Sequence, residues 1–140
     1  MIDHSDTEAV IEQCFNEISA ASRETYDSAK ADRTAALFLT AQMKLSFLIE
    51  EVELSSKQAK NEIVRVEGEK YFECKEAGQD KKITENMITN YVAKHPDIVN
   101  AKTECAKQEA ALKKWGFILN SLKDGHIYFR NLAKGKIWQE

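Results

Sequence analysis

The longest stretch without a helix breaker constrains the fold of this chain most strongly. Between residues 32 and 77 there is no proline, and Gly68 is the only glycine. Glutamate, lysine, leucine and alanine, all strong helix formers, make up about half of this stretch. The sequence therefore predicts one long helix over residues 33–77. A helix of this length needs a long antiparallel partner to cover its apolar face.

Apolar residues recur along this predicted helix in steps of three and four. The seam consists of Phe38, Ala41, Leu45, Leu48, Val52, Ser55, Ala59, Ile63 and Val66. The step from Ala59 to Ile63 is a stutter, which loosens a supercoil locally. Four more apolar residues flank the start of the seam: Leu37, Leu39, Phe47 and Ile49. We therefore expect the start of the helix to be buried on more than one side.

The last third of the chain supplies the partner helix. Pro96 suits the first turn of a helix, where its missing N–H costs nothing. The seam that follows consists of Ile98, Ala101, Cys105, Gln108, Leu112, Trp115, Leu119 and Leu122. The same frame continues past Gly125, so we predict a helix over 96–133 with a kink near Gly125. Seven residues are predicted to form the core or an interface between copies: Leu45, Leu48, Val52, Leu112, Trp115, Leu119 and Leu122.

Two shorter elements complete the predicted fold. Residues 1–32 form an acidic N-terminal helix whose apolar stripe thins beyond Ile18, and Asp27-Ser28 offers a place for it to end. A short helix over 84–94 begins with Thr84 as N-cap, after Gly78 has ended the long helix. We predict an all-α fold, a single helical domain over 1–140. Its architecture is a long antiparallel helical hairpin or coiled-coil-like bundle with an N-terminal helix.

The composition argues against an active site, a cofactor or a metal centre. The sequence contains no phosphate-binding glycine loop and no nucleophile elbow, and its histidines have no metal-ligand spacing. Two Glu-x-x-Glu pairs, Glu50/Glu53 and Glu73/Glu76, could hold Mg²⁺ only if they faced each other, as in all-α nucleotide pyrophosphohydrolases. Both pairs fall on one predicted helix. We therefore expect no enzyme activity, with such a hydrolase as a minor alternative.

The expected setting is the cytoplasm. Three separated cysteines do not form a disulfide framework, and no stretch reaches the roughly 18 apolar residues that a membrane span needs. The N-terminus does not have the layout of a secretory signal.

Charge is distributed unevenly along the chain. Residues 1–32 carry eight acids against two bases, whereas residues 99–138 carry eight bases against three acids. Aromatic rings accompany these bases, as in proteins that bind single-stranded nucleic acid by phosphate contacts and base stacking. Trp115 and Phe129 fall on the seam and are better explained as core, while Tyr128 and Trp138 lie off it. The candidate DNA-binding residues are Lys57, Lys60, Arg65, Lys70, Lys113, Lys114, Tyr128, Arg130, Lys134 and Lys136.

Several sequence features occur in an order that resembles a known family. They are Tyr71-Phe72 before Ala77-Gly78, a helix start at Thr84, the run His95-Pro96-Asp97-Ile98-Val99, Trp115-Gly116-Phe117-Ile118-Leu119, and Asp124-Gly125-His126-Ile127. Over roughly residues 35–130 the chain resembles the UvsY-type recombination mediators of tailed bacteriophages. The resemblance implies cofactor-free helical subunits in a homo-oligomeric ring that bind single-stranded DNA in the host cytoplasm. They would help to load a RecA-like recombinase onto strands covered by single-strand-binding protein, in DNA recombination and repair.

The resemblance also implies a position for the DNA site. Basic residues on the long helix just before the aromatic pair would contact DNA, which corresponds to Lys60, Arg65 and Lys70 here. The net charge of −3 favours a second hypothesis, a helical protein-interaction module (an adaptor or inhibitor) that binds no nucleic acid.

Overall fold

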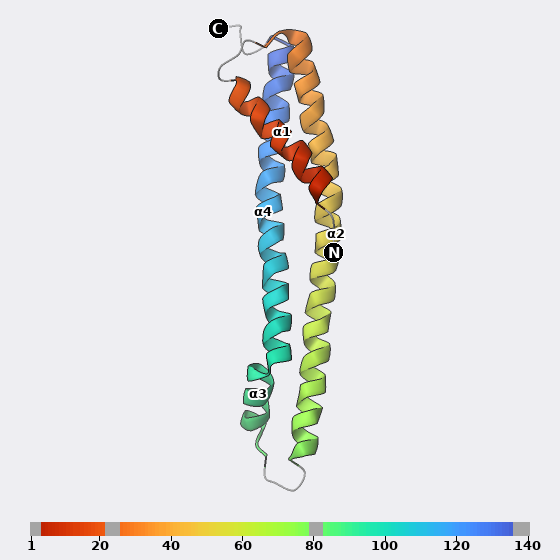
Figure 1. Cartoon of the computed structure of the whole chain (residues 1–140), viewed down its shortest axis with the longest axis vertical. Coiled ribbons are helices and arrows are strands. Elements are labelled where there is room, and N and C mark those ends of the chain that lie inside the picture. The colour runs from red at the N-terminus through yellow and green to blue at the C-terminus, as the bar shows by residue number, and fades with distance from the viewer. Residues whose placement is uncertain (1–3, 22–25, 79–82, 136–140) are drawn as a thin grey trace. The chain divides into compact units, whose positions relative to one another are not determined.

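The computed structural model describes residues 4–21, 26–78 and 83–135 of the chain. These residues form four α-helices and no strand: α1 (Ser5–Ala21), α2 (Ser28–Ala77), α3 (Glu85–Lys94) and α4 (Pro96–Ala133) (Figure 1). The predicted all-α fold with long helices is therefore confirmed. The chain divides into two compact units, Met1–Glu51 with Lys113–Glu140 (the α1 unit) and Val52–Leu112 (the α3 unit).

In the α1 unit, α2 and α4 run antiparallel. The Ser28 hydroxyl donates a hydrogen bond to the carbonyl oxygen of Ala133 (2.6 Å), at the start of α2 and the end of α4. Further along α2, the side-chain amide of Gln42 donates to the carbonyl oxygen of Leu122 (3.5 Å). Residue numbers rise along one helix as they fall along the other, as in the predicted hairpin.

An aromatic cluster forms the centre of this unit. Phe38 of α2 and Phe129 of α4 are fully or almost fully buried, and their ring centroids lie 5.3 Å apart. Tyr26, just before α2, also packs against Phe129, with ring centroids 5.5 Å apart. Pairs at this spacing contribute about 0.5–1.5 kcal/mol beyond their area burial. The three rings therefore fix the end of α4 against the start of α2.

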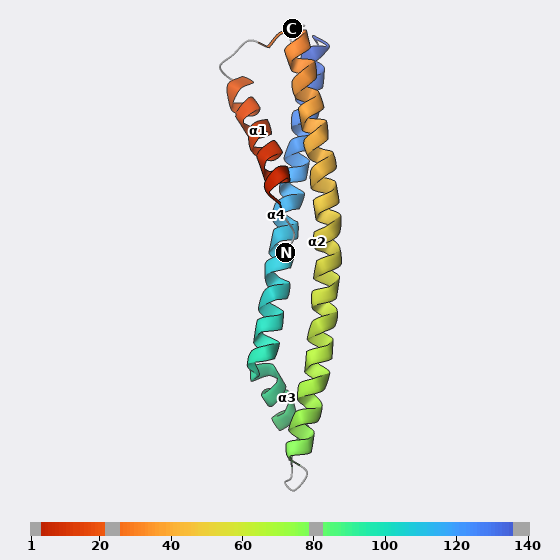
Figure 2. The same cartoon turned by 45° about the vertical axis from the view of Figure 1, so that its right-hand side comes forward.

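Helix α1 lies alongside α2 and α4 in this unit (Figures 1 and 2). Ile11 and Cys14 are buried, and Asp6 at the start of the helix pairs with Lys44 of α2 at 2.8 Å. Burial raises the pKa of the Cys14 thiol to about 11, and the nearby carboxylate of Glu17 adds to this shift. Cys14 is thus a small buried hydrophobe rather than a reactive thiol.

The first helix ends earlier than its predicted span over 1–32. It stops at Ala21, and Tyr26 and Asp27 are not helical. The reason is the chemistry of Asp27, whose carboxylate accepts a hydrogen bond from the backbone N–H of Lys30 (2.7 Å). An aspartate that caps the next helix cannot also continue the previous one. As a result, α2 begins at Ser28 rather than at residue 33.

In the α3 unit, ion pairs join α2 to α4 in antiparallel order. Lys60 pairs with Glu109 (3.3 Å), Glu67 with Lys102 (3.8 Å) and Lys70 with Asp97 (3.2 Å). The buried apolar side chains of this unit are fewer and smaller than those of the α1 unit: Val52, Val66, Ile88, Ile98 and Cys105. The seam includes buried Ser56, whereas the predicted Ser55 is only half-buried, because the stripe shifts by one residue here.

The ends of the helices in this unit follow the local sequence. Thr84 is the N-cap of α3, and its hydroxyl accepts a hydrogen bond from the backbone N–H of Met87 (3.2 Å), as predicted. Helix α4 begins at Pro96, also as predicted. Gly78 follows α2, and a Cβ at this position would lie 1.5 Å from Cδ1 of Ile83. Glycine is therefore needed for close packing of the chain that returns from α2.

The outer face of α2 is less buried than the sequence suggests. Leu39 and Phe47 are 47% and 64% exposed, which corrects the expectation that the start of this helix is buried on several sides. Met43, midway between them, is 57% exposed. The three residues lie four apart and so share one face of the helix, which we call the α2 apolar face.

Candidate nucleic-acid interface

One face of α4 in the α1 unit presents cations to solvent. Lys123, Ile127 and Arg130 of α4 and Lys134, which directly follows the helix and still bonds its backbone N–H to the carbonyl of Arg130 (3.2 Å), follow the spacing i, i+4, i+7 and i+11 of one helical row. We call this row the α4 basic stripe. All four side chains are exposed, and the row extends over roughly 16 Å at about 1.5 Å per residue. The stripe is therefore long enough to follow a phosphate backbone.

The cations of the stripe are not neutralised within the described part of the chain. No described carboxylate lies within ion-pair distance of Lys123, Arg130 or Lys134, and the same holds for Lys113. Arg130 also lies in the last turn of α4, where a cation stabilises the helix dipole. Among the described residues, the cations of the stripe therefore have no acidic partner.

The bases predicted on α2 are in a different electrostatic situation. Arg65 is held between Glu62 and Glu69, and its hydrogen bond to Glu62 raises the pKa of Arg65 and lowers the pKa of Glu62. The ammonium of Lys70 pairs with the carboxylates of Asp97 and Glu73, each at 3.2 Å. Both hydrogen bonds raise the pKa of Lys70, and the bond to Asp97 has the larger effect.

Lys60 is paired with Glu109, while Lys57 is exposed with no carboxylate near it among the described residues. Three of the four bases predicted on α2 therefore already have acidic partners, and a phosphate would have to displace them.

The remaining predicted contacts are divided between different surfaces. Lys114 lies over the ring of Trp115, with its ammonium 5.1 Å from the ring centroid. Tyr128 is 44% exposed but is two residues from Arg130, so the two side chains face different sides of α4. Lys136 lies outside the described residues.

The predicted core residues lie mainly inside the two units. Leu45, Leu48, Val52, Trp115 and Leu122 are buried, and Leu112 and Leu119 are half-buried.

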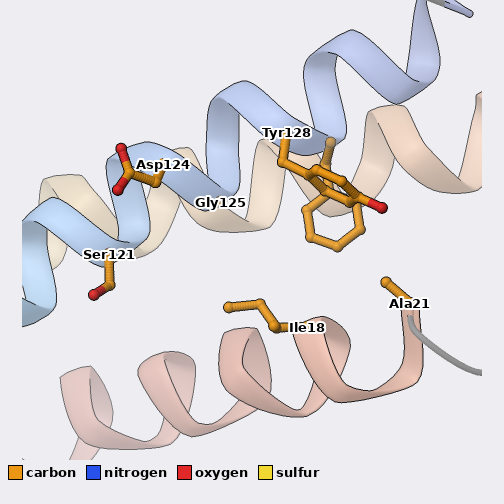
Figure 3. Close-up of a pocket in the computed structure, with 7 residues that line it drawn as sticks. Ile18, Ala21, Ser121, Asp124, Gly125 and Tyr128 are labelled. Atoms are coloured by element: carbon orange, nitrogen blue, oxygen red, sulfur yellow. The ribbon is translucent and has the colours of Figure 1, made fainter. Parts of the chain in front are cut away.

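Tyr128 lines a groove between α1 and α4, which we call the α1–α4 groove. Figure 3 shows Ile18 projecting from α1 into the gap, opposite Ser121 and Tyr128 of α4. The groove has a volume of about 430 Å³, and its other lining residues are Ala21, Asp124, Gly125 and Phe129. Ile18 is 43% exposed although Ile11, seven residues earlier on the same face of α1, is buried. The apolar stripe of α1 therefore continues beyond the part of this helix that is buried.

Sequence reasoning missed two members of the α4 basic stripe, Lys123 and Ile127. The available signal was the spacing of Lys123, Arg130 and Lys134, which share a helix face, whereas the prediction grouped bases by their closeness along the chain. It also missed the α2 apolar face, because exposed and buried apolar stripes look alike in a sequence.

No metal or membrane site emerges from the described residues. No three or more of their His, Cys, Asp and Glu side chains are grouped so that they could hold a metal ion. The carboxylates of Glu50, Glu53, Glu73 and Glu76 all lie along α2. None of the described helices combines the length and apolar character required to cross a membrane.

Comparison of the chain with family models, curated proteins and solved structures found no match.

Proposed function

We propose that this protein is a non-enzymatic accessory protein that binds single-stranded DNA through the α4 basic stripe. One observation carries the proposal: the cations of the stripe are exposed and have no carboxylate partner among the described residues, whereas three of the four bases predicted to bind DNA on α2 do. Phosphates gain most from unpaired cations, because no existing ion pair has to break. Ile127, 46% exposed within the row, offers apolar contact to an unstacked base.

The biological role is proposed from the sequence resemblance to UvsY-type mediators. In that role the protein would help a RecA-like recombinase to replace single-strand-binding protein on DNA, in the cytoplasm of a phage-infected host. This role requires a protein that holds the strand without consuming a cofactor.

The net charge of −3 is compatible with this proposal if several subunits act together. Each subunit then adds one stripe, and linked weak sites bind with much higher avidity than one site. The α2 apolar face supports such assembly, because Leu39, Met43 and Phe47 form a contiguous apolar row on the surface. We propose a homo-oligomer, such as a ring, in which this face contacts another copy.

The same apolar face also favours a second candidate function, a helical adaptor whose α2 binds another protein. The two functions differ in whether DNA binds at all. Fluorescence anisotropy of a labelled oligo-dT strand, with duplex DNA in parallel, at about 50 and 300 mM salt distinguishes them. The proposal predicts binding to the single strand that weakens steeply with salt. No binding at low salt, by protein shown to be folded, would contradict it and leave the adaptor.

A further inference from the structure

Gly68 is an interior residue of α2 where the described part of the chain does not require a glycine. A Cβ added here would meet no described atom within 4 Å, and the φ angle of Gly68 is not positive. Glycine inside a helix is nevertheless destabilising relative to alanine. What a glycine supplies on an exposed helix face is room for the backbone of another helix to approach closely.

Exposed apolar side chains lie one turn before and one turn after Gly68. Val64 and Phe72, at i−4 and i+4, are 69% and 63% exposed. Buried Val66 lies on the opposite side of α2, at about 100° per residue, so the three residues face away from the interior of the α3 unit. An apolar face with a gap at its centre fits a helix that crosses at Gly68.

Charged side chains end this row on both sides. Steps of four residues connect Lys60, Val64, Gly68, Phe72 and Glu76, a row that we call the Gly68 ridge. Lys60 and Glu76 are exposed, and each is eight residues from Gly68. The ridge therefore has a cation at one end, an anion at the other end and apolar side chains between them.

This order of side chains is complementary to itself. When two copies of the ridge cross antiparallel at Gly68, Lys60 of each copy lies beside Glu76 of the other. Val64 of each copy then lies beside Phe72 of the other. Ridges of spacing four pack in this way at a crossing angle of about 50°, the commonest class in globular proteins. A parallel crossing would instead bring like charges together, so the charges favour a two-fold, isologous pair.

Both charged residues of the ridge can take part in such a contact. Glu76 has no basic partner among the described residues. Lys60 pairs with Glu109 (3.3 Å), but 61% of the Lys60 side chain is exposed, and exposed ion pairs contribute little to stability. Exchange of one carboxylate for the other is therefore nearly neutral. The charges set the orientation of the two copies, and apolar burial supplies the affinity.

We propose that the Gly68 ridge pairs two copies of this chain, antiparallel and related by a two-fold axis. Val64, Gly68 and Phe72 form the close apolar contact. A single helix crossing is small beside the roughly 1,600 Å² of a standard interface, so the pairing is weak and depends on concentration. It uses other residues than the α2 apolar face and does not depend on DNA binding.

Gly68→Gln tests the close approach of the two helices. The parent for this test is the full chain with Met43→Lys and Phe47→Lys, which removes association through the α2 apolar face. Glutamine favours a helix but fills the gap in the ridge. The variant should therefore unfold at a higher urea concentration when dilute, yet its dissociation constant in sedimentation equilibrium should rise at least tenfold. Gly116→Gln is the matched control, because its added Cβ also has open space, and it should gain stability without a change in pairing.

Charge reversal in the same parent tests the direction of the contact. Lys60→Glu and Glu76→Lys should each weaken pairing severalfold, because each substitution brings like charges together twice in a symmetric pair. An equimolar mixture of the two single variants should recover the pairing of the parent, since every contact between them again joins a cation to an anion. Loss of the bond between Lys60 and Glu109 cannot explain this recovery, because that bond stays absent in the mixture.

Three results would overturn the proposal. A parent that stays monomeric at the highest concentrations that sedimentation can follow would leave this face to a helix of another protein. Equal pairing of the Gly68→Gln and Gly116→Gln variants would exclude a close approach at Gly68. A mixture of Lys60→Glu and Glu76→Lys that pairs no better than its components would exclude the antiparallel contact.

Discussion

At the residue scale, Gly125 shows how a helix can require glycine in its interior. A Cβ at this position would lie 2.2 Å from Cε1 of Phe38, whose ring is fully buried. Helix α4 continues through Gly125 without a turn, so the glycine serves close packing of two helices. The sequence predicted a kink or a turn here, and the turn is absent; the close packing was not predicted, because a single sequence does not reveal which ring lies opposite a glycine.

Substitution of Gly125 should separate packing from helix propensity. Gly125→Ala should destabilise the protein by about 1–3 kcal/mol, because the new methyl group overpacks against Phe38. Gly116→Ala is the control, since nothing lies within 4 Å of its added Cβ and alanine favours a helix by about 0.5–1 kcal/mol. Urea unfolding followed by circular dichroism measures both. Equal stabilisation by the two substitutions would contradict the described packing of α4 on α2.

At the scale of the helices, the sequence was most informative where a boundary is set by local chemistry. The cap at Thr84 and the start at Pro96 follow from one or two residues. The end of α1 was less predictable, because Asp27 can either continue an acidic helix or cap the next one. The cap formed by Asp27 and the packing of Tyr26 on Phe129 both accompany the break, and the second contact cannot be read from the sequence.

The capping role of Asp27 has a measurable consequence. Asp27→Ala removes the carboxylate that accepts the backbone N–H of Lys30 and should cost about 1 kcal/mol of unfolding free energy. Asp32→Ala removes the same charge from an exposed position on α2 and should change stability by less than about 0.5 kcal/mol. Thermal or urea unfolding of both variants compares them. A similar effect of the two substitutions would contradict the assigned cap.

The candidate interface illustrates a second limit of the sequence. The sequence shows where the basic residues lie, both on α2 and near the C-terminus, but it does not show which of them have acidic partners. Lys60, Arg65 and Lys70 are matched by acids that are three or four residues away or on α4. Lys123, Arg130 and Lys134 have no described partner. Only the three-dimensional arrangement separates paired from unpaired charge.

At the scale of the whole molecule, the α2 apolar face should drive assembly. Met43 and Phe47 are 57% and 64% exposed, and burying them between copies removes apolar surface from water. Met43→Lys combined with Phe47→Lys should lower the molar mass found by size-exclusion chromatography with light scattering. Phe117→Lys, at a ring 75% exposed on α4, should leave the mass unchanged. A parent that is monomeric at all concentrations would contradict the proposed assembly.

The most direct test of the central claim is the salt dependence of single-strand binding by matched charge variants. The stripe variant carries Lys123→Gln, Arg130→Gln and Lys134→Gln, and the control carries Lys60→Gln, Arg65→Gln and Lys70→Gln. Both lose three positive charges. Each lost phosphate contact should lower the slope of log affinity against log salt by about 0.7. We expect weaker binding and a slope smaller by about 2 for the stripe variant, with little change for the control. Loss of binding in the control but not in the stripe variant would contradict the account and place the DNA site on α2.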